Sequence, residues 1–329
     1  MQITFFFRKP SPSYHSIEKL FSAIIEDLPL GLAIQHFSPY QSKGLWKRIL
    51  IGLDAQKFQG TINHITGDIH FIALFLPKKK TILTIHDIGI IKQGNFLKRF
   101  IIKLLWFKIP IWRVKMVTVI SEFTKQELIK HLNINQAKIT VIHNCIPNIY
   151  QFSPENEPEE KPVILQIGTK ENKNLERLVK AIENMECKLI IVGILSDSQI
   201  DTLKTYKIDY ENHFNISAKG MLSLYKKCDL LAYISTYEGF GMPVVEANAV
   251  GRPVLASNVE PMKSVAANAA LLVDPYNVQE IRNQIKKLLT DKHLRDDLIK
   301  NGLENAKKYR SAEIAKEYLT IYQKMLERK

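Results

Sequence analysis

The sequence is poor in cysteine. Its three cysteines, Cys145, Cys187 and Cys228, are widely spaced in 329 residues and form no C-x-x-C pair. Neither a disulfide framework nor a structural zinc site is therefore indicated, and we expect buried, reduced thiols.

Long apolar runs are also missing. A bilayer span needs roughly 20 consecutive apolar residues, and the richest stretch, Phe100 to Trp112, is interrupted by Lys103 and Lys108. At the N-terminus an apolar run precedes the charges, which is the reverse of a secretory signal. We therefore expect a cytoplasmic chain without a membrane span, a location that also permits peripheral attachment to the inner face of the membrane.

Several signatures of nucleotide and metal chemistry are absent as well. There is no G-x-x-x-x-G-K-[ST] loop, so ATP hydrolysis of the P-loop type is disfavoured. No D-x-D or H-E-x-x-H motif offers metal ligands, and the one Gly-x-Gly turn lacks the third glycine of a dinucleotide fingerprint. We expect chemistry without a bound metal.

Positive charge is abundant and unevenly distributed. The chain has 46 Lys and Arg against 33 Asp and Glu, a net charge of +13. Residues 1–150 contain 20 of these cations and only 8 of the acids, a net charge of +12. This asymmetry predicts that the first half alone meets an anionic surface or ligand. Nucleic acid is not the expected partner, because no helix-turn-helix, RNA-recognition or zinc motif accompanies the charge.

Residues 92–115 concentrate this basic character. The segment has seven cations and no acid, with Trp106, Phe107 and Trp112 among aliphatic residues. Such a composition is typical of an interfacial helix on anionic lipid. It equally fits a core helix whose lysines are merely solvated, and the composition alone leaves both interpretations open.

Short β-branched or aromatic runs alternate with amphipathic helical stretches in both halves. This alternation predicts an α/β protein of two Rossmann-like domains. The strands expected in the first half are Ile3–Phe7, Gly31–His36, Thr81–His86, Met116–Ile120 and Lys138–Ile142. Those expected in the second half are Val163–Ile167, Lys188–Val192, Asp229–Ile234, Pro253–Ala256 and Ala270–Val273.

A proline-rich and acidic stretch, Pro147 to Pro162, is expected to link the domains, since its composition suits neither helix nor sheet. Residues 1–150 are therefore assigned to one domain and residues 151–310 to the other. Residues 311–329 have apolar positions at helical period, which predicts a last helix that packs back across the domain junction.

The most informative segment is Tyr237-Glu-Gly-Phe-Gly-Met-Pro-Val-Val-Glu-Ala247. A Gly-x-Gly turn leads from a strand into a helix opened by Pro243, so backbone N–H groups and the positive helix end favour an anion there. Glu238 and Glu246 flank this turn, and their carboxylates are suited to accept hydrogen bonds from hydroxyls. A nucleotide sugar supplies both phosphate and hydroxyls. A purely structural turn is the alternative, and the two glutamates argue against it.

The stretch Glu238-Gly-Phe-Gly-Met-Pro-Val-Val-Glu246 resembles the E-x7-E signature of family 4 retaining glycosyltransferases. Val163–Leu178 is similar to the first strand, loop and helix of that family's donor domain, and Ile85-His86-Asp87 to one of its N-terminal strand ends. The resemblance implies the GT-B fold, in which an acceptor-side N-terminal domain faces a nucleotide-sugar-binding C-terminal domain across a cleft.

The same resemblance implies the function. It indicates a retaining, metal-independent glycosyltransferase of the hexosyltransferase type. The enzyme would move a sugar from a nucleotide-diphosphate sugar, with no cofactor, to a glycan or lipid-linked acceptor in cell-surface polysaccharide synthesis.

The expected catalytic residues are Glu238, His86 and Asp87. Glu238 would hold sugar hydroxyls and offset positive charge at the anomeric carbon. His86, at a strand end where open α/β sheets place ligands, would orient the sugar, with Asp87 in support. The donor-binding residues implied are Gly168, Thr169, Lys173, Asn174, Gly239, Phe240, Gly241, Met242 and Glu246. Among them, Lys173 and the N–H groups of the turn would meet the diphosphate, and Glu246 the ribose.

The chain departs from the family pattern in its loops. Thr169 stands where many members have Arg, which leaves Lys173 as the evident cation of the donor loop. The loop after the first strand has no glycine motif, so acceptor binding by Arg8, Lys9 and His15 is inferred from position alone.

Two rival functions belong to other classes. One is a non-catalytic homologue that binds a sugar nucleotide and regulates a partner enzyme, and the other is a nucleotide-sugar epimerase of the same fold. Retention of both Glu238 and Glu246 argues against each of them.

Overall fold

The computed structural model describes residues 1–10, 16–92, 94–154 and 160–327. Contacts divide the chain into two units. The first comprises residues 1–147 together with the chain from Ser311 onward, and the second comprises residues 148–310. The division thus falls at 147/148, where 150/151 is expected from composition, and the last helix is part of the first unit.

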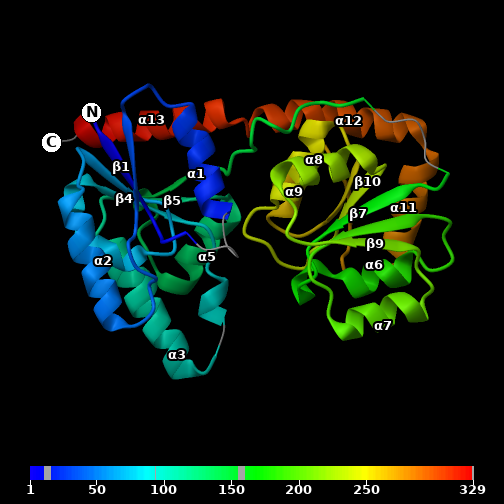
Figure 1. Ribbon diagram of the computed structural model, residues 1–329, viewed down its shortest axis with the longest axis horizontal. Helices are drawn as coiled ribbons and strands as arrows, with labels where there is room; N and C mark the ends of the chain where they lie inside the picture. The colour runs from blue at the N-terminus through cyan, green and yellow to red at the C-terminus, as the bar shows by residue number, and fades with distance from the viewer. Residues whose placement is uncertain (11–15, 93, 155–159, 328–329) are drawn as a thin grey trace. The chain divides into compact units, whose positions relative to one another are not determined.

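In the first unit six parallel strands form a sheet in the order β2-β1-β3-β4-β5-β6 (Figure 1). The strands are β1 (Ile3–Phe7), β2 (Ala33–Phe37), β3 (Ile62–Ile65), β4 (Thr81–Ile85), β5 (Met116–Val119) and β6 (Ile139–Val141). The helices are α1 (Ser16–Glu26), α2 (Leu45–Lys57), α3 (Phe96–Ile101), the π-helix η4 (Ile102–Lys108), α4 (Ile109–Trp112), α5 (Glu122–Leu132) and α13 (Ser311–Glu327).

The second unit repeats this plan with the strand order β12-β11-β10-β7-β8-β9, again all parallel. Its strands are β7 (Val163–Ile167), β8 (Lys188–Val192), β9 (Tyr210–His213), β10 (Leu230–Tyr233), β11 (Val254–Ser257) and β12 (Leu271–Val273). Its helices are α6 (Leu175–Ala181), α7 (Asp197–Thr205), α8 (Ala218–Lys227), α9 (Met242–Val250), α10 (Met262–Ala266), α11 (Val278–Thr290) and α12 (Lys292–Lys307).

The prediction of two doubly wound α/β units is confirmed, and every expected strand overlaps an observed one. Two strands were not expected, β3 and β9. β3 reads Ile-Asn-His-Ile, with two polar residues buried in its middle, and β9 reads Tyr-Glu-Asn-His at a half-buried sheet edge. Neither has the apolar run by which the other strands are recognised.

Both faces of the first sheet are covered, which explains the run of apolar residues in β1. Ile3, Phe5 and Phe7 pack under α1 and α13, while Phe6 belongs to the core on the other face, with residues of α2, η4 and α5. Figure 1 shows α1 and α13 on one side of this sheet and α2 and α3 on the other. The apolar residues of α13, among them Ile314, Tyr318 and Tyr322, pack in the same core as Ile3, Phe5 and Phe7.

A buried histidine connects α13 to the sheet. His64 of β3 lies with Nδ1 2.6 Å from Tyr322 Oη and Nε2 2.7 Å from Thr84 Oγ1. Burial lowers the pKa of His64 to about 3, and burial lowers that of His70 to about 4. Both imidazoles are therefore neutral in the folded protein at physiological pH.

Among the residues that the structure describes, no helix is both long enough and apolar enough to cross a membrane.

Candidate functional site

Two loops of the second unit meet at the carboxyl ends of adjacent strands. Strand β7 leads into the donor loop, residues 168–174, and its neighbour β10 leads into the Gly-x-Gly turn that precedes α9. The two loops are joined directly: Asn172 Nδ2 donates to Tyr237 O at 2.8 Å, and Thr236 N donates to Asn172 O at 2.8 Å. The sheet topology thus brings together segments some 65 residues apart in sequence, as the separation of Asn172 and Tyr237 illustrates.

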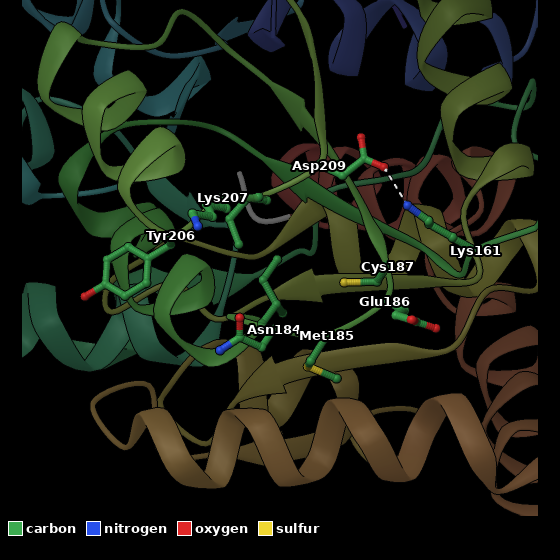
Figure 2. Close-up of a pocket in the computed structure, with 10 residues that line it drawn as sticks. Lys161, Asn184, Met185, Glu186, Cys187, Tyr206, Lys207 and Asp209 are labelled. Atoms are coloured by element: carbon green, nitrogen blue, oxygen red, sulfur yellow. Dashed lines mark hydrogen bonds and ion pairs between the residues drawn. The ribbon is translucent and has the colours of Figure 1, made fainter.

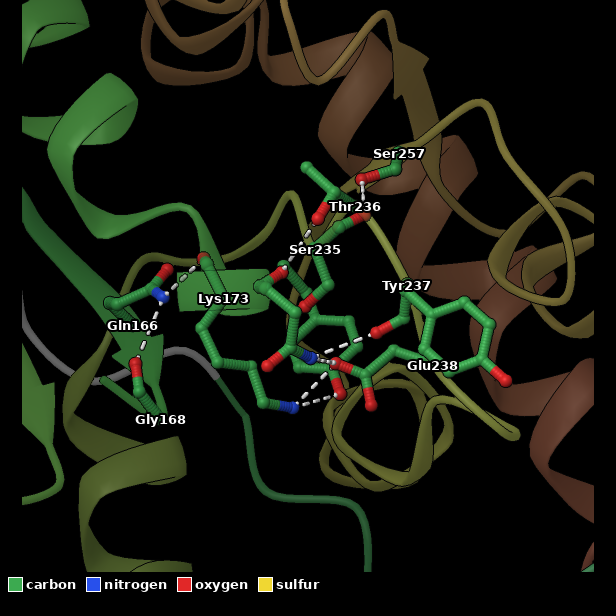
Figure 3. A network of polar contacts seen from close by, with 10 residues as sticks. Gln166, Gly168, Lys173, Ser235, Thr236, Tyr237, Glu238 and Ser257 are labelled. Carbon is green, nitrogen blue, oxygen red and sulfur yellow. Dashed lines mark hydrogen bonds and ion pairs between the residues drawn. The ribbon is translucent and has the colours of Figure 1, made fainter. Parts of the chain in front are cut away.

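Lys173 and Glu238 form an ion pair where these loops meet. Lys173 Nζ lies 2.6 Å from Glu238 Oε1, and the two side chains are 18% and 15% exposed. Lys173 Nζ also donates to Tyr233 Oη at 2.8 Å. Figure 3 shows the Lys173 ammonium group directed toward the Glu238 carboxylate. The cation and the carboxylate that were expected at the donor therefore lie within one hydrogen-bond length of each other.

The shape of the donor loop depends on Gly168 and Gln166. Gly168 has φ +92°, and a Cβ there would lie 2.8 Å from the Lys173 side chain, so only glycine leaves room for that chain to pass. Gln166 Nε2 donates to Gly168 O at 3.2 Å and to Lys173 O at 3.0 Å, closing the loop (Figure 3). Thr169 Oγ1 donates to Ile194 O at 2.6 Å and connects the loop to the chain that follows β8.

Two residues expected to bind the donor use their side chains within the protein. Asn174 is buried, has φ +62°, and donates through Nδ2 to Ile234 O at 3.1 Å and to Pro275 O at 2.6 Å. Phe240 is buried, with its ring edge-on to Tyr309 at 5.6 Å. Both side chains hold the loops in place, so any contact of these residues with a ligand has to come from backbone atoms.

Helix α9 follows the Gly-x-Gly turn directly. It begins at Met242 after Gly241, whose φ is +106°, and no side chain caps it. Pro243 stands in the first turn, where its missing N–H costs nothing. Glu246, one turn further, accepts a hydrogen bond of 2.7 Å from the hydroxyl of buried Tyr225. Gly239 and Met242, which lie between Glu238 and Glu246 in the sequence, are half-buried.

The carboxyl ends of β1, β3 and β4 form the corresponding edge of the first unit. His86 Nε2 lies 2.7 Å from Thr66 O, and since a carbonyl only accepts, this nitrogen carries the proton. Burial lowers the pKa of His86, so its Nδ1 is an unprotonated acceptor. A Cβ at Gly67, with φ +142°, would lie 2.8 Å from His86, so the loop after β3 fits closely around this ring.

The other residues expected at this edge have varied surroundings. Arg8 Nε donates to Glu18 Oε1 at 2.8 Å, and its guanidinium also pairs with Asp68. Asp87 accepts from Gly89 N at 2.8 Å, and Lys9 is exposed. His15 lies outside the described residues. Asp68 was not among the expected residues, because β3 itself was missed.

A pocket at the opposite end of the second sheet contains none of the expected residues (Figure 2). It is lined by side chains just before β8 and β9, including Cys187 and the pair Lys161–Asp209, whose Nζ and Oδ2 are 3.5 Å apart. Burial raises the pKa of Cys187 to about 11, so its thiol is not reactive. Across the described residues, no group of three His, Cys, Asp or Glu side chains could hold a metal ion.

Within the basic segment of the first unit, residues 96–112 form a continuous helix that exposes several apolar side chains. Phe107 and Ile111 are buried in the core. Phe96 is 85% exposed and Trp112 65%, and the other exposed apolar residues are Leu97, Phe100, Ile101, Leu104 and Leu105. Trp112 also has Lys78 Nζ 5.0 Å from its ring centroid.

Comparison with known proteins gives matches along most of the chain. The family model described as "Glycosyl transferases group 1" matches residues 150–305, and "Glycosyltransferase Family 4" matches residues 18–148. The O-antigen chain mannosyltransferase RfbU of Salmonella typhimurium is 28% identical over 73% of this chain and 67% of its own length. The N,N'-diacetylbacillosaminyl-diphospho-undecaprenol alpha-1,3-N-acetylgalactosaminyltransferase of Campylobacter jejuni is 26% identical over 70% of this chain and 65% of its own. The chain thus matches about two thirds of each relative's length.

Solved structures resemble the whole chain. HepE from Anabaena, crystallised with UDP, aligns with a TM-score of 0.79 at 16% identity, over 98% of this chain and 100% of its own. A glycosyltransferase from Rickettsia africae aligns with a TM-score of 0.77 at 17% identity, over 100% of both chains. At these identities the likeness shows a common fold.

Proposed function

The chain belongs to glycosyltransferase family 4, with its GT-B fold, and we propose that it moves a sugar from a nucleotide-diphosphate sugar to an acceptor with retention of anomeric configuration. The observation that carries this proposal is the pairing of Lys173 with Glu238 at 2.6 Å beside the start of α9. One group suits a diphosphate, and the other suits the sugar attached to it.

The chemistry proposed is mainly electrostatic. The departing diphosphate gathers negative charge, which Lys173 and the N-terminal end of α9 would stabilise without a metal ion. Glu238 would accept hydrogen bonds from sugar hydroxyls and offset the positive charge that grows at the anomeric carbon. The departing phosphate would itself take the acceptor's proton, as the likeness to retaining transferases implies. Nδ1 of His86 would accept a hydrogen bond from a sugar hydroxyl, because burial lowers the pKa of this imidazole and favours its neutral form.

The acceptor proposed is a glycan or a lipid-linked saccharide of cell-surface polysaccharide synthesis. Support comes from the relatives, of which one is named for O-antigen chains and another for an undecaprenol diphosphate saccharide. It also comes from the exposed apolar and basic face of residues 96–112.

A donor screen tests the proposed function. Full-length protein is heated with UDP, GDP and ADP sugars, and hydrolysis of each sugar is followed with Mg²⁺ and with EDTA. A donor at 100 times its dissociation constant should add roughly 2.7 kcal/mol of stability, and its hydrolysis should be equal in both buffers. Stabilisation without any turnover, even with candidate acceptors, would instead support a non-catalytic homologue, and epimerised sugar would support the epimerase.

The docking surface proposed for the membrane is the exposed face of α3, η4 and α4. A helix that merely keeps lysines in solvent would bury its apolar residues, whereas Phe96, Phe100 and Trp112 are exposed here. Lys98, Arg99, Lys103 and Lys108 lie on the same helical segment. Exposed aromatic rings and cations on one helical segment are the chemistry that anionic lipid headgroups attract.

Vesicle sedimentation distinguishes this surface from a general effect of net charge. Since each cation contributes about 1 kcal/mol near an anionic surface, changing Lys98, Arg99, Lys103 and Lys108 to Gln should weaken binding to anionic vesicles by up to about 10³-fold. Added salt should weaken it as well. The matched control changes Lys292, Lys300, Lys307 and Lys308 to Gln, exposed cations of the second unit. Equal losses in both variants, or no binding at low salt, would refute the proposed surface.

A further inference from the structure

In the ion pair at the donor site, Glu238 occupies the Lys173 ammonium that is proposed to bind the diphosphate. Lys173 Nζ is held by Glu238 Oε1 at 2.6 Å and by Tyr233 Oη at 2.8 Å, and Glu238 Oε1 also accepts from Asn172 Nδ2 at 3.4 Å. While paired, the ammonium and the carboxylate largely cancel each other's charge. For Lys173 to meet a diphosphate and Glu238 to meet sugar hydroxyls, their contact has to lengthen.

Tyr233 is the partner that does not have to move. It is the last residue of β10, between β7 and β11 in the sheet, and its side chain is only 2% exposed. Its Cε1 would be 3.8 Å from a Cβ at Gly241, so the ring also lies under the turn before α9. The tyrosine is thus fixed by the sheet, whereas Lys173 ends a single 3-10 turn, Glu171–Lys173, and Glu238 lies in a loop.

The protonation of Tyr233 suits this position. Burial, and next the Glu238 carboxylate, raise the pKa of Tyr233 well above its usual value. The hydroxyl therefore stays neutral, so its oxygen can accept from the Lys173 ammonium without cancelling the positive charge offered to a phosphate. A lysine ammonium has three donors, which allows it to bind Tyr233 and a phosphate oxygen together.

We propose that Tyr233 is a positioning residue, whose hydroxyl holds the Lys173 ammonium at the diphosphate site when Glu238 turns to the donor sugar. This inference depends on the proposed function. It adds a specific residue to the site, and it assigns the ion pair as the resting state that the donor opens.

A double-mutant cycle tests the inference. Dissociation constants for UDP, GDP and their nucleosides are measured by calorimetry on wild type, Tyr233→Phe, Lys173→Ala and the double variant. A hydrogen bond to a charged group contributes about 1.5–3 kcal/mol, so Tyr233→Phe should weaken binding of the nucleoside diphosphate by roughly tenfold or more. Tyr233→Phe should change the dissociation constant of the nucleoside by no more than about twofold. In the Lys173→Ala background it should cause no further loss of affinity for the nucleoside diphosphate.

Tyr225→Phe is the matched control. Tyr225 is a second buried tyrosine of this unit, and its hydroxyl binds Glu246 at 2.7 Å, away from Lys173. Its loss should affect nucleoside and nucleoside diphosphate alike, because Glu246 is proposed to hold the ribose. If Tyr233→Phe behaves in the same way, or is fully additive with Lys173→Ala, Tyr233 only packs and the inference is wrong.

A second variant keeps the test decisive should Tyr233→Phe fail to fold. In Glu238→Gln the ammonium retains Tyr233 but loses its counter-charge, so affinity for the nucleoside diphosphate should be unchanged or higher. A tenfold loss there would mean that Tyr233 alone does not position Lys173. If wild type binds no nucleoside diphosphate at all, the proposed function fails and the inference fails with it.

Discussion

Glu238→Gln is expected to lower the turnover number by about 10²–10³-fold, while the affinity for the nucleotide-sugar donor stays unchanged or rises. The substitution keeps the size of the side chain and one accepting oxygen but removes the negative charge. Losing one well-placed electrostatic group at a partly buried site costs about 3–4 kcal/mol of transition-state stabilisation. The donor does not lose affinity, because Lys173 is released from its 2.6 Å contact. Steady-state kinetics with the donor found by the screen measures both quantities.

The second glutamate provides the contrasting variant. Glu246 lies on α9 and accepts from Tyr225, so Glu246→Ala should weaken binding of the nucleotide about tenfold and change turnover less. Circular dichroism and the melting temperature should show both variants folded. Wild-type turnover in Glu238→Gln, or the same kinetic change in both variants, would contradict the separate roles proposed for the two carboxylates.

The sequence predicts which loops form the site, but it does not predict the contacts between their side chains. Lys173 and Glu238 each follow an expected strand, and each was expected at the donor. Their direct contact could not be foreseen, because it depends on β10 being the neighbour of β7 in the sheet. The motif places residues along the chain but does not orient their side chains: Asn174 and Phe240 were expected to face the donor, yet both side chains are buried in the protein.

Tyr233 illustrates the limit more sharply. It is one aromatic residue in the expected strand Asp229–Ile234. The strand pattern does not distinguish a tyrosine whose hydroxyl bonds to a lysine from a tyrosine that only packs in the core. In the first unit the same limit hides the loop Thr66-Gly67-Asp68, since β3 has polar residues at its centre. The central His64 of β3 bonds to Tyr322, 258 residues away in the sequence, and to Thr84, 20 residues away. Only the fold brings these side chains together.

Acidification from pH 6.5 to 5.0 is expected to lower the stability of the first unit by about 3 kcal/mol through His64 and His70. The pKa values of His64 and His70 are about 3 and about 4 in the folded protein, below the usual 6.5. As the pH falls below 6.5 the unfolded chain binds protons that the folded protein excludes, so stability is lost in this window. The loss for each histidine approaches about 1.36 kcal/mol per pH unit well below pH 6.5 and is half as steep at pH 6.5, which gives about 1.6 kcal/mol over this window. Trp46, Trp106 and Trp112 all belong to the first unit, so tryptophan fluorescence during urea unfolding measures it.

His64→Gln separates this mechanism from general acid sensitivity. The Gln amide can still bond the hydroxyls of Tyr322 and Thr84 but takes up no proton, so the stability lost over the same window should be smaller by about 1.6 kcal/mol. His293→Gln, at an exposed position of the second unit, should leave the dependence unchanged. The first unit places His64 and His86 around the same ring, Phe21, with centroids 5.0 and 6.2 Å away. Burial lowers the pKa of His86 as well, so its own proton uptake on unfolding adds to the dependence that remains in His64→Gln. A flat stability profile between pH 6.5 and 5.0 would show that the buried imidazoles are not the cause.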